Sequence, residues 1–231
     1  MRLTATLAIG SLCLLASAMA RAADQTVLGN VLTVKNPSTA GKRKILGKAK
    51  ELGSPNTIVG NPTVGGGTLT IRADGGTPTT QTFTLPQGVS GMTGKSFWTG
   101  DALGGFKYKD AKGENSAVKS VLIRKNASGV FLIKVVVSGK IGTLSVVPPD
   151  PGTAGCVFLS LGGGDSYSVL FGAGSTLINK DGLLFKAKKP TAEGSCLPTT
   201  TTTSTTSSTT STTLYGSPSR AFIDRVPGLL D

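Results

Sequence analysis

The chain has 231 residues, a formal net charge of +12 and no histidine. The lack of histidine excludes Ser-His-Asp and Cys-His catalysis, and it excludes zinc sites with histidine ligands. Only 16% of the residues are charged, whereas glycine and proline number 32 and 12, a composition typical of a β protein with many turns.

The first 22 residues have the pattern of a secretory signal peptide. Arg2 precedes an apolar run from Leu3 to Ala18, and small-x-small cleavage sites end at Ala20 and Ala22. The apolar run is short for a bilayer span. We therefore predict an exported protein, extracellular or periplasmic, with no membrane span after signal cleavage.

Residues 24–198 are predicted to form one β domain, because segments of strand period alternate with turn signals. In residues 44–50, for example, Ile45, Gly47 and Ala49 fall on one side and lysines dominate the other. A long glycine-rich loop is predicted over residues 87–105. The first predicted strands cover residues 27–35, 41–51, 68–73, 80–85 and 106–109.

Residues 118–138 are predicted to form a β-hairpin around the polar turn N-A-S-G. Phe131, Ile133, Val135 and Val137 share one face of the second strand, and the opposite face is also partly apolar. A strand that is apolar on both faces is usually central in its sheet.

The later strands are predicted with inward and outward faces of the same kind, and in the last of them Leu183, Phe185 and Ala187 are expected to point inward. About a dozen short strands separated by turns indicate an all-β antiparallel β-sandwich of the immunoglobulin-like or jelly-roll-like type. These later strands cover residues 140–147, 156–161, 167–171, 175–179 and 183–188.

Two cysteines, Cys156 and Cys196, remain after signal cleavage. In an oxidising compartment a single pair is expected to form a disulfide, the alternative being two free buried thiols. Residues 199–213 contain only threonine and serine and are predicted to be a disordered spacer. A short tail over residues 214–231 follows, in which residues 221–226 favour a helical turn or two.

A ligand-binding surface is predicted around the end of the glycine-rich loop, because aromatic rings beside polar groups suit stacking on a sugar or packing on a protein. The alternative is that Trp98 and Phe106 plug one end of the sandwich. The candidate ligand-binding residues are Trp98, Asp101, Lys107, Tyr108 and Lys109.

The sequence assigns no catalytic residue, no metal site and no cofactor, so we predict a protein that is not an enzyme. The expected role is structural, adhesive or ligand-binding, with a polysaccharide or an envelope protein as partner. An alternative is a glycosidase, which needs two carboxylates across a cleft, here Asp101 with Asp110 or Glu114.

A third hypothesis is electrostatic binding of an acidic polymer. The lysines occur at alternate strand positions, which favours solvent-facing strand residues over a nucleic-acid site, and no nucleic-acid partner is expected. Binding of an acidic polymer would require these lysines to cluster on one face.

Several short motifs resemble a group of uncharacterised secreted β-domains found in predicted proteins of environmental bacteria. The motifs are G-K-R-K-I at 41–45, G-G-T-L-T-I at 66–71, T-F-T-L-P at 82–86, G-F-K-Y-K-D at 105–110 and the C-L-P-T-T-T that begins at Cys196. The resemblance extends from Val27 to Thr213. It implies no activity and assigns no functional residue.

Overall fold

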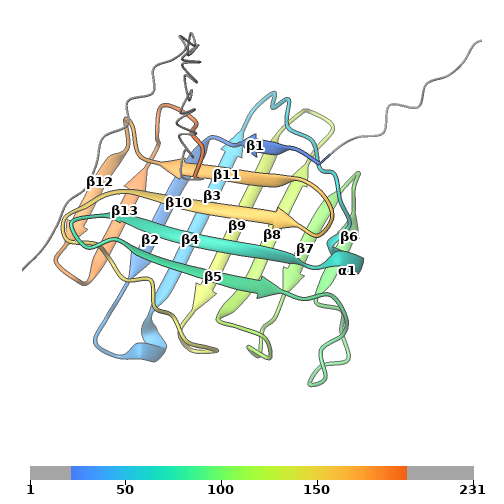
Figure 1. Ribbon diagram of the computed structural model, residues 1–231, viewed down its shortest axis with the longest axis horizontal. Helices are drawn as coiled ribbons and strands as arrows, with labels where there is room; N and C mark the ends of the chain where they lie inside the picture. Colours follow the sequence, from blue (N-terminus) through green and yellow to red (C-terminus); the bar gives the residue numbers. More distant parts are fainter. Residues whose placement is uncertain (1–21, 197–231) are drawn as a thin grey trace, which may run out of the picture. The chain divides into compact units, whose positions relative to one another are not determined.

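A computed structural model describes residues 22–196, which form strands β1 to β13, a 3-10 turn over Ala40–Lys42 and one short helix, α1 (Pro62–Gly65) (Figure 1). The predicted spacer and tail lie outside the described residues, and so does the predicted signal peptide apart from Ala22.

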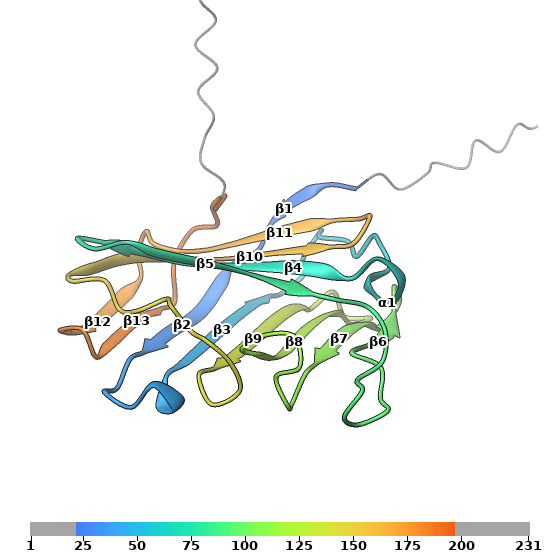
Figure 2. The ribbon, with the colours of Figure 1, turned by 60° about the horizontal axis from the view of Figure 1, so that its bottom comes forward.

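The strands form two sheets that lie face to face (Figure 2). The order β1-β11-β10-β4-β5 makes a five-stranded sheet, and β12-β13-β2-β3-β9-β8-β7-β6 makes an eight-stranded sheet. All pairs are antiparallel except β1 with β11. The predicted all-β sandwich is confirmed.

The five-stranded sheet contains β1 (Asp24–Thr26), β4 (Gly67–Gly75), β5 (Thr79–Leu85), β10 (Gly152–Leu161) and β11 (Ser166–Phe171). The eight-stranded sheet contains β2 (Gly29–Lys35), β3 (Lys44–Glu51), β6 (Trp98–Asp101), β7 (Gly105–Lys109), β8 (Val118–Lys125), β9 (Phe131–Ser138), β12 (Thr176–Lys180) and β13 (Leu184–Lys188).

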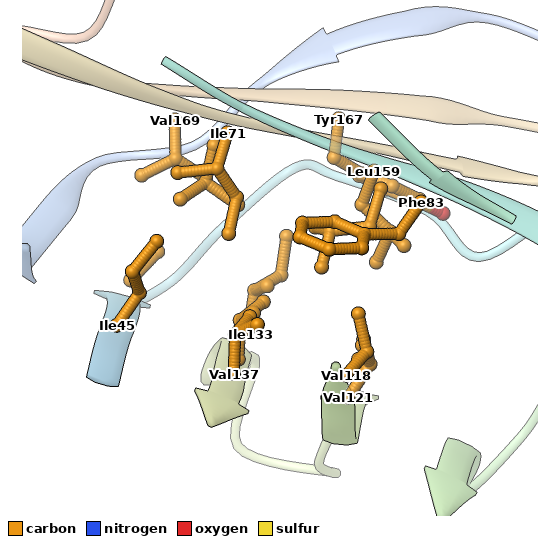
Figure 3. Close-up of a cluster of buried hydrophobic side chains, with 14 of the residues drawn as sticks. Ile45, Ile71, Phe83, Val118, Val121, Ile133, Val137, Leu159, Tyr167 and Val169 are labelled. Atoms are coloured by element: carbon orange, nitrogen blue, oxygen red, sulfur yellow. The ribbon is translucent and has the colours of Figure 1, made fainter. Parts of the chain in front are cut away.

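The hydrophobic core fills the space between the two sheets, because each strand turns alternate apolar residues inward. Ile71 and Phe83 of the five-stranded sheet approach Ile133 and Val121 of the eight-stranded sheet (Figure 3). All four side chains are at most 4% exposed. This shared core fixes which face of each strand is left for solvent or a ligand.

The predicted hairpin over residues 118–138 is confirmed as β8 and β9, and β9 lies between β8 and β3 as its two-faced apolar pattern predicts. Phe131, Ile133, Val135 and Val137 are all buried, and Lys134 is exposed on the opposite face. The alternation predicted for residues 44–50 also holds in β3, where the lysines face outward.

Residues 140–147 do not form the predicted strand. The segment runs beside β5, but its backbone is hydrogen-bonded to the side chain of Gln81 and not to the β5 backbone. The Gln81 Nε2 donates to the Thr143 carbonyl at 3.2 Å, and the Ser145 N–H donates to Gln81 Oε1 at 2.8 Å. Because a side chain stands between the two backbones, no regular ladder forms, and the segment covers the edge of the five-stranded sheet.

Two further predictions need correction. The predicted loop over residues 87–105 contains strand β6, which pairs with β7. Leu183 was expected to point inward, but it precedes β13 and is 56% exposed. It lies in the turn before β13, where its own N–H donates to the Lys180 carbonyl. Phe185 and Ala187 are buried as predicted.

The predicted disulfide is confirmed: Cys156 on β10 bonds Cys196, with 5.7 Å between the Cα atoms and 40 residues of separation. It attaches the end of the described chain to the outer face of the five-stranded sheet. Within residues 22–196 we find no helix with the length and apolar character needed to cross a membrane.

Candidate functional site

The predicted aromatic surface is wrong for Trp98 and Tyr108, which are 2% and 0% exposed. Strand period turns both residues inward from β6 and β7, where their ring centroids lie 5.3 Å apart. The Trp98 indole N–H donates to the Leu85 carbonyl at 3.1 Å. Burial, followed by the charge of Asp110, raises the pKa of Tyr108 to about 12. These rings cannot stack on a ligand, and the alternative that Trp98 and Phe106 plug one end of the sandwich is confirmed.

Asp101 has a structural role in the turn between β6 and β7. Its Oδ1 accepts hydrogen bonds from the N–H groups of Leu103 and Gly104, at 2.9 and 2.6 Å. An Asp that accepts such bonds from the following backbone is typical of a turn. Asp101 does not line the groove that contains Asp110 and Glu114, so the structure does not bring together the carboxylate pair of the glycosidase hypothesis.

Lys107 and Lys109, the other two predicted residues, line a groove of about 460 Å³ on the outer side of β6 and β7. Its walls come from two loops, residues 90–96 before β6 and residues 110–114 after β7. The lining residues are Ser90, Thr93, Lys95, Ser96, Phe97, Thr99, Lys107, Lys109, Asp110, Ala111, Lys112 and Glu114.

The two carboxylates of the groove hold its loops in place. Asp110 is 2% exposed and accepts hydrogen bonds from the N–H groups of Gly113, Glu114 and Asn115, at 2.8–3.0 Å. Glu114 in turn accepts from the Ser90 hydroxyl and from the Gly91 N–H at 2.8 Å. Because both carboxylates are engaged with the loop residues, they are not paired with the lysines of the groove.

The lysines of the groove form no ion pair with any described residue. The ammonium groups of Lys95, Lys107, Lys109 and Lys112 make no hydrogen bond or ion pair within residues 22–196. The sequence pattern identified two of them, whereas Lys95 and Lys112 belong to loops whose position depends on the folded structure.

The groove continues onto a wider positive surface, which we call the basic face: the outer side of the eight-stranded sheet. The register places an outward Lys or Arg on every strand of this sheet except β6. Asp101 is the sole carboxylate that faces outward from these strands. The cations are Lys35, Lys44, Lys48, Lys50, Lys107, Lys109, Arg124, Lys134, Lys180, Lys186 and Lys188.

Like charges lie directly opposite each other at two places on the basic face. Lys35 of β2 is opposite Lys44 of β3, and Lys48 of β3 is opposite Lys134 of β9. Directly opposed like charges destabilise a sheet. A shallow depression of about 210 Å³ lies beside the first pair, with Lys186 also in its lining.

The outer side of the five-stranded sheet has a different character. Threonines dominate its β4–β5 part, where the Thr70 and Thr82 hydroxyls are 2.8 Å apart across the strands. Its cation Arg72 pairs with Asp74 at 2.8 Å, the one ion pair that the described residues contain. Unpaired positive charge on the sandwich is therefore concentrated on the eight-stranded sheet.

Asp165 forms a separate buried carboxylate cluster that the sequence pattern did not distinguish from an ordinary turn. It is 0% exposed, and its carboxylate accepts from the N–H groups of Ala23 and Val59 at 2.9 and 2.8 Å. A Cβ on the preceding Gly164 would lie 2.0 Å from the Val59 oxygen, so this close approach requires glycine. Asp165 holds the turn against the loop before α1, which is a structural role.

Glu51 and Glu193 form the other carboxyl cluster. Burial and a hydrogen bond to Glu193 raise the pKa of Glu51, while the bonds from Glu51 and from the Thr26 hydroxyl lower the pKa of Glu193. The Thr26 hydroxyl donates to Glu193 at 2.7 Å, which fastens the segment before Cys196 to β1. Across residues 22–196 we find no group of three or more His, Cys, Asp or Glu side chains placed to bind a metal ion.

Comparisons with protein-family models, curated proteins and solved structures each find no match to this chain. The resemblance to uncharacterised secreted β-domains therefore stays a prediction, and the function is argued from the geometry.

Proposed function

We propose that this protein is an exported, non-catalytic β-sandwich that binds an acidic polysaccharide on the basic face, at the cell envelope or outside the cell. One observation carries the proposal: the outward lysines of the eight-stranded sheet share one face, pair with no described carboxylate and stand opposite each other at Lys48 and Lys134. A polyanion would supply the missing counter-charge.

The dimensions of the basic face suit an extended polymer. One row of the register crosses the sheet from Lys186 through Thr33, Leu46, Val136 and Ser120 to Lys109. These residues belong to β13, β2, β3, β9, β8 and β7, so the row extends over roughly 24 Å at the usual strand spacing. It connects the shallow depression to the groove.

The side chains of the basic face favour an acidic polysaccharide over nucleic acid. Single-stranded nucleic acid binds where aromatic rings stack on bases. The outward positions of these strands carry no aromatic side chain, and Phe97 in the groove is buried. Duplex DNA is read by an element that enters a groove of the duplex, whereas this face is a sheet surface. Lysine supplies point charges rather than the bidentate fork that arginine offers to phosphate.

Export is supported by the signal-peptide pattern of residues 1–22 and by the Cys156–Cys196 disulfide, since disulfides form and persist in oxidising compartments. The folded domain would then meet polymers of the cell surface or its surroundings directly.

The test is binding of the mature chain to immobilised polygalacturonate, with neutral dextran as the matched control. We expect retention on polygalacturonate alone, with affinity that falls steeply between roughly 50 and 200 mM salt. Equal retention on dextran, or affinity that is flat over this salt range, would refute the proposal. Tighter binding to single-stranded DNA or to anionic lipid vesicles than to polygalacturonate would reassign the basic face to that partner.

A further inference from the structure

We propose that the groove beside β6 and β7 is a subsite for one acidic sugar unit, bound through Lys95, Lys107, Lys109 and Lys112. The inference rests on the proposed function and deepens it, because it assigns recognition of a single unit to the groove at the β6–β7 end of the basic face. At about 460 Å³ the groove lies within the usual size range of small-molecule sites, roughly 300–1,000 Å³.

The lysines approach the groove from three parts of the chain. Lys107 and Lys109 point outward from β7, Lys95 comes from the loop before β6, and Lys112 comes from the loop after β7. Cations on several sides can contact a carboxylate or sulfate held between them, whereas a flat row of lysines contacts an anion from one side only. This arrangement favours recognition of one charged unit.

The walls of the groove are preorganised. Asp110 holds residues 113–115 through their backbone N–H groups, and Glu114 links that loop to Ser90 and Gly91 of the other wall. The Ser90 carbonyl also accepts the Gly94 N–H at 2.8 Å, which closes the turn that carries Lys95. Binding therefore requires little ordering of the loops, and a preorganised site loses less free energy on binding.

The same hydrogen bonds indicate which anion the groove suits. The N–H groups of Gly91, Gly113 and Asn115 are bonded to Glu114 or Asp110, so they are not free to cradle a phosphate. The donors that remain are the lysine ammonium groups and hydroxyls such as those of Thr93 and Ser96. Ammonium and hydroxyl groups around an apolar floor formed by Phe97 suit a carboxylate on a polyhydroxylated ring.

The test uses digalacturonate as the probe, followed by amide chemical-shift changes and calorimetry on the mature chain. We expect shift changes confined to residues 88–99 and 105–115. The double variant Lys95→Gln/Lys112→Gln should weaken digalacturonate binding about tenfold or more through the loss of two charged contacts. The matched control, Lys42→Gln/Lys189→Gln, removes two exposed lysines that lie in neither the groove nor the basic face, and it should leave digalacturonate binding within about twofold.

The outcomes for this subsite and for the polymer are separable. Loss of digalacturonate binding in Lys95→Gln/Lys112→Gln, with polygalacturonate still retained, supports the subsite. Unchanged digalacturonate binding in that variant, or shift changes spread evenly over the basic face, would overturn the subsite while the polymer proposal stands. Equal competition by inorganic phosphate would overturn it in favour of a general anion site. A chain that binds digalacturonate but not polygalacturonate refutes the proposed function alone.

Discussion

Removing one lysine from the centre of the basic face should stabilise the protein and weaken its polymer binding at the same time. Lys48 lies directly opposite Lys134 across β3 and β9. The change is Lys48→Gln, which keeps a polar side chain of similar length and removes the charge. A solvated face without function would show the first effect and not the second.

The control lies two residues along the same strand. Lys50 is opposite Leu132, so Lys50→Gln removes a charge without relieving a like-charge pair. Cross-strand charge pairs contribute about 0.2–1 kcal/mol. We therefore expect Lys48→Gln to exceed Lys50→Gln in free energy of unfolding by about that amount, which corresponds to roughly 0.5–4 °C in Tm for a domain of this size.

The stability assay is urea unfolding at low salt, because added salt screens the repulsion between exposed charges. The binding assay is the slope of log affinity for polygalacturonate against log salt concentration. Each lost lysine contact should make this slope shallower. With nucleic acids the change is roughly 0.7–0.9 per charge, and we expect a smaller change here because polygalacturonate has a lower charge density.

The double variant Lys48→Gln/Lys134→Gln closes a thermodynamic cycle. Once the first lysine is neutral, removing the second relieves no repulsion, so the two stability gains should not add. Additive gains, or a loss of stability in Lys48→Gln relative to Lys50→Gln, would refute the repulsion. An unchanged salt slope in all three variants would refute the polymer contact.

Three further predictions concern the scaffold. Replacing the disulfide in Cys156→Ala/Cys196→Ala should lower the free energy of unfolding by about 4 kcal/mol, as loop entropy gives for 40 residues, measured by urea unfolding. Trp98→Ala should cost about 3–5 kcal/mol of stability by leaving a cavity, yet leave polygalacturonate affinity unchanged in the folded fraction, since the ring is buried. The pKa of Tyr108 is raised to about 12 in the folded protein, against an ordinary value near 10. The unfolded chain therefore ionises first, and the free energy of unfolding should fall as pH rises from 10 to 12. A Tyr108→Phe variant should lose less stability over that window, measured by unfolding at a series of pH values.

Alternation along single strands could be predicted from the sequence because each strand reports its own inward and outward faces. Residues 44–50 show this: Ile45, Gly47 and Ala49 are buried and the lysines between them face out. The same rule assigns Trp98 and Tyr108 inward. The glycine-rich composition around Trp98 favoured a loop, where strand period does not apply. Tyr108 lies in the predicted strand 106–109, where alternation separates it from Lys107 and Lys109 and opposes their grouping on one surface. Four residues of β6 are too few for a pattern to be distinguished from loop sequence.

The groove and the like-charge pairs could not be predicted, because they depend on neighbours that are distant in sequence. Lys48 and Lys134 become opposite each other only through the register of β3 with β9. Lys95 and Lys112 reach one groove because Asp110 and Glu114 bond the backbones of their loops. A turn context predicts that such an acid accepts hydrogen bonds from backbone N–H groups, but it does not predict which loops these hydrogen bonds join.

The uneven distribution of charge between the two outer sides of the sandwich argues that the lysines serve more than solubility. A soluble sandwich needs polar groups on both outer sides, and hydroxyl groups meet that need on the five-stranded sheet, as Thr70 and Thr82 illustrate. The eight-stranded sheet instead places Lys48 against Lys134, an arrangement that costs stability when the face is empty. A ligand that carries negative charge attracts both ammonium groups and so offsets their mutual repulsion. The same lysines that destabilise the free protein therefore stabilise its complex.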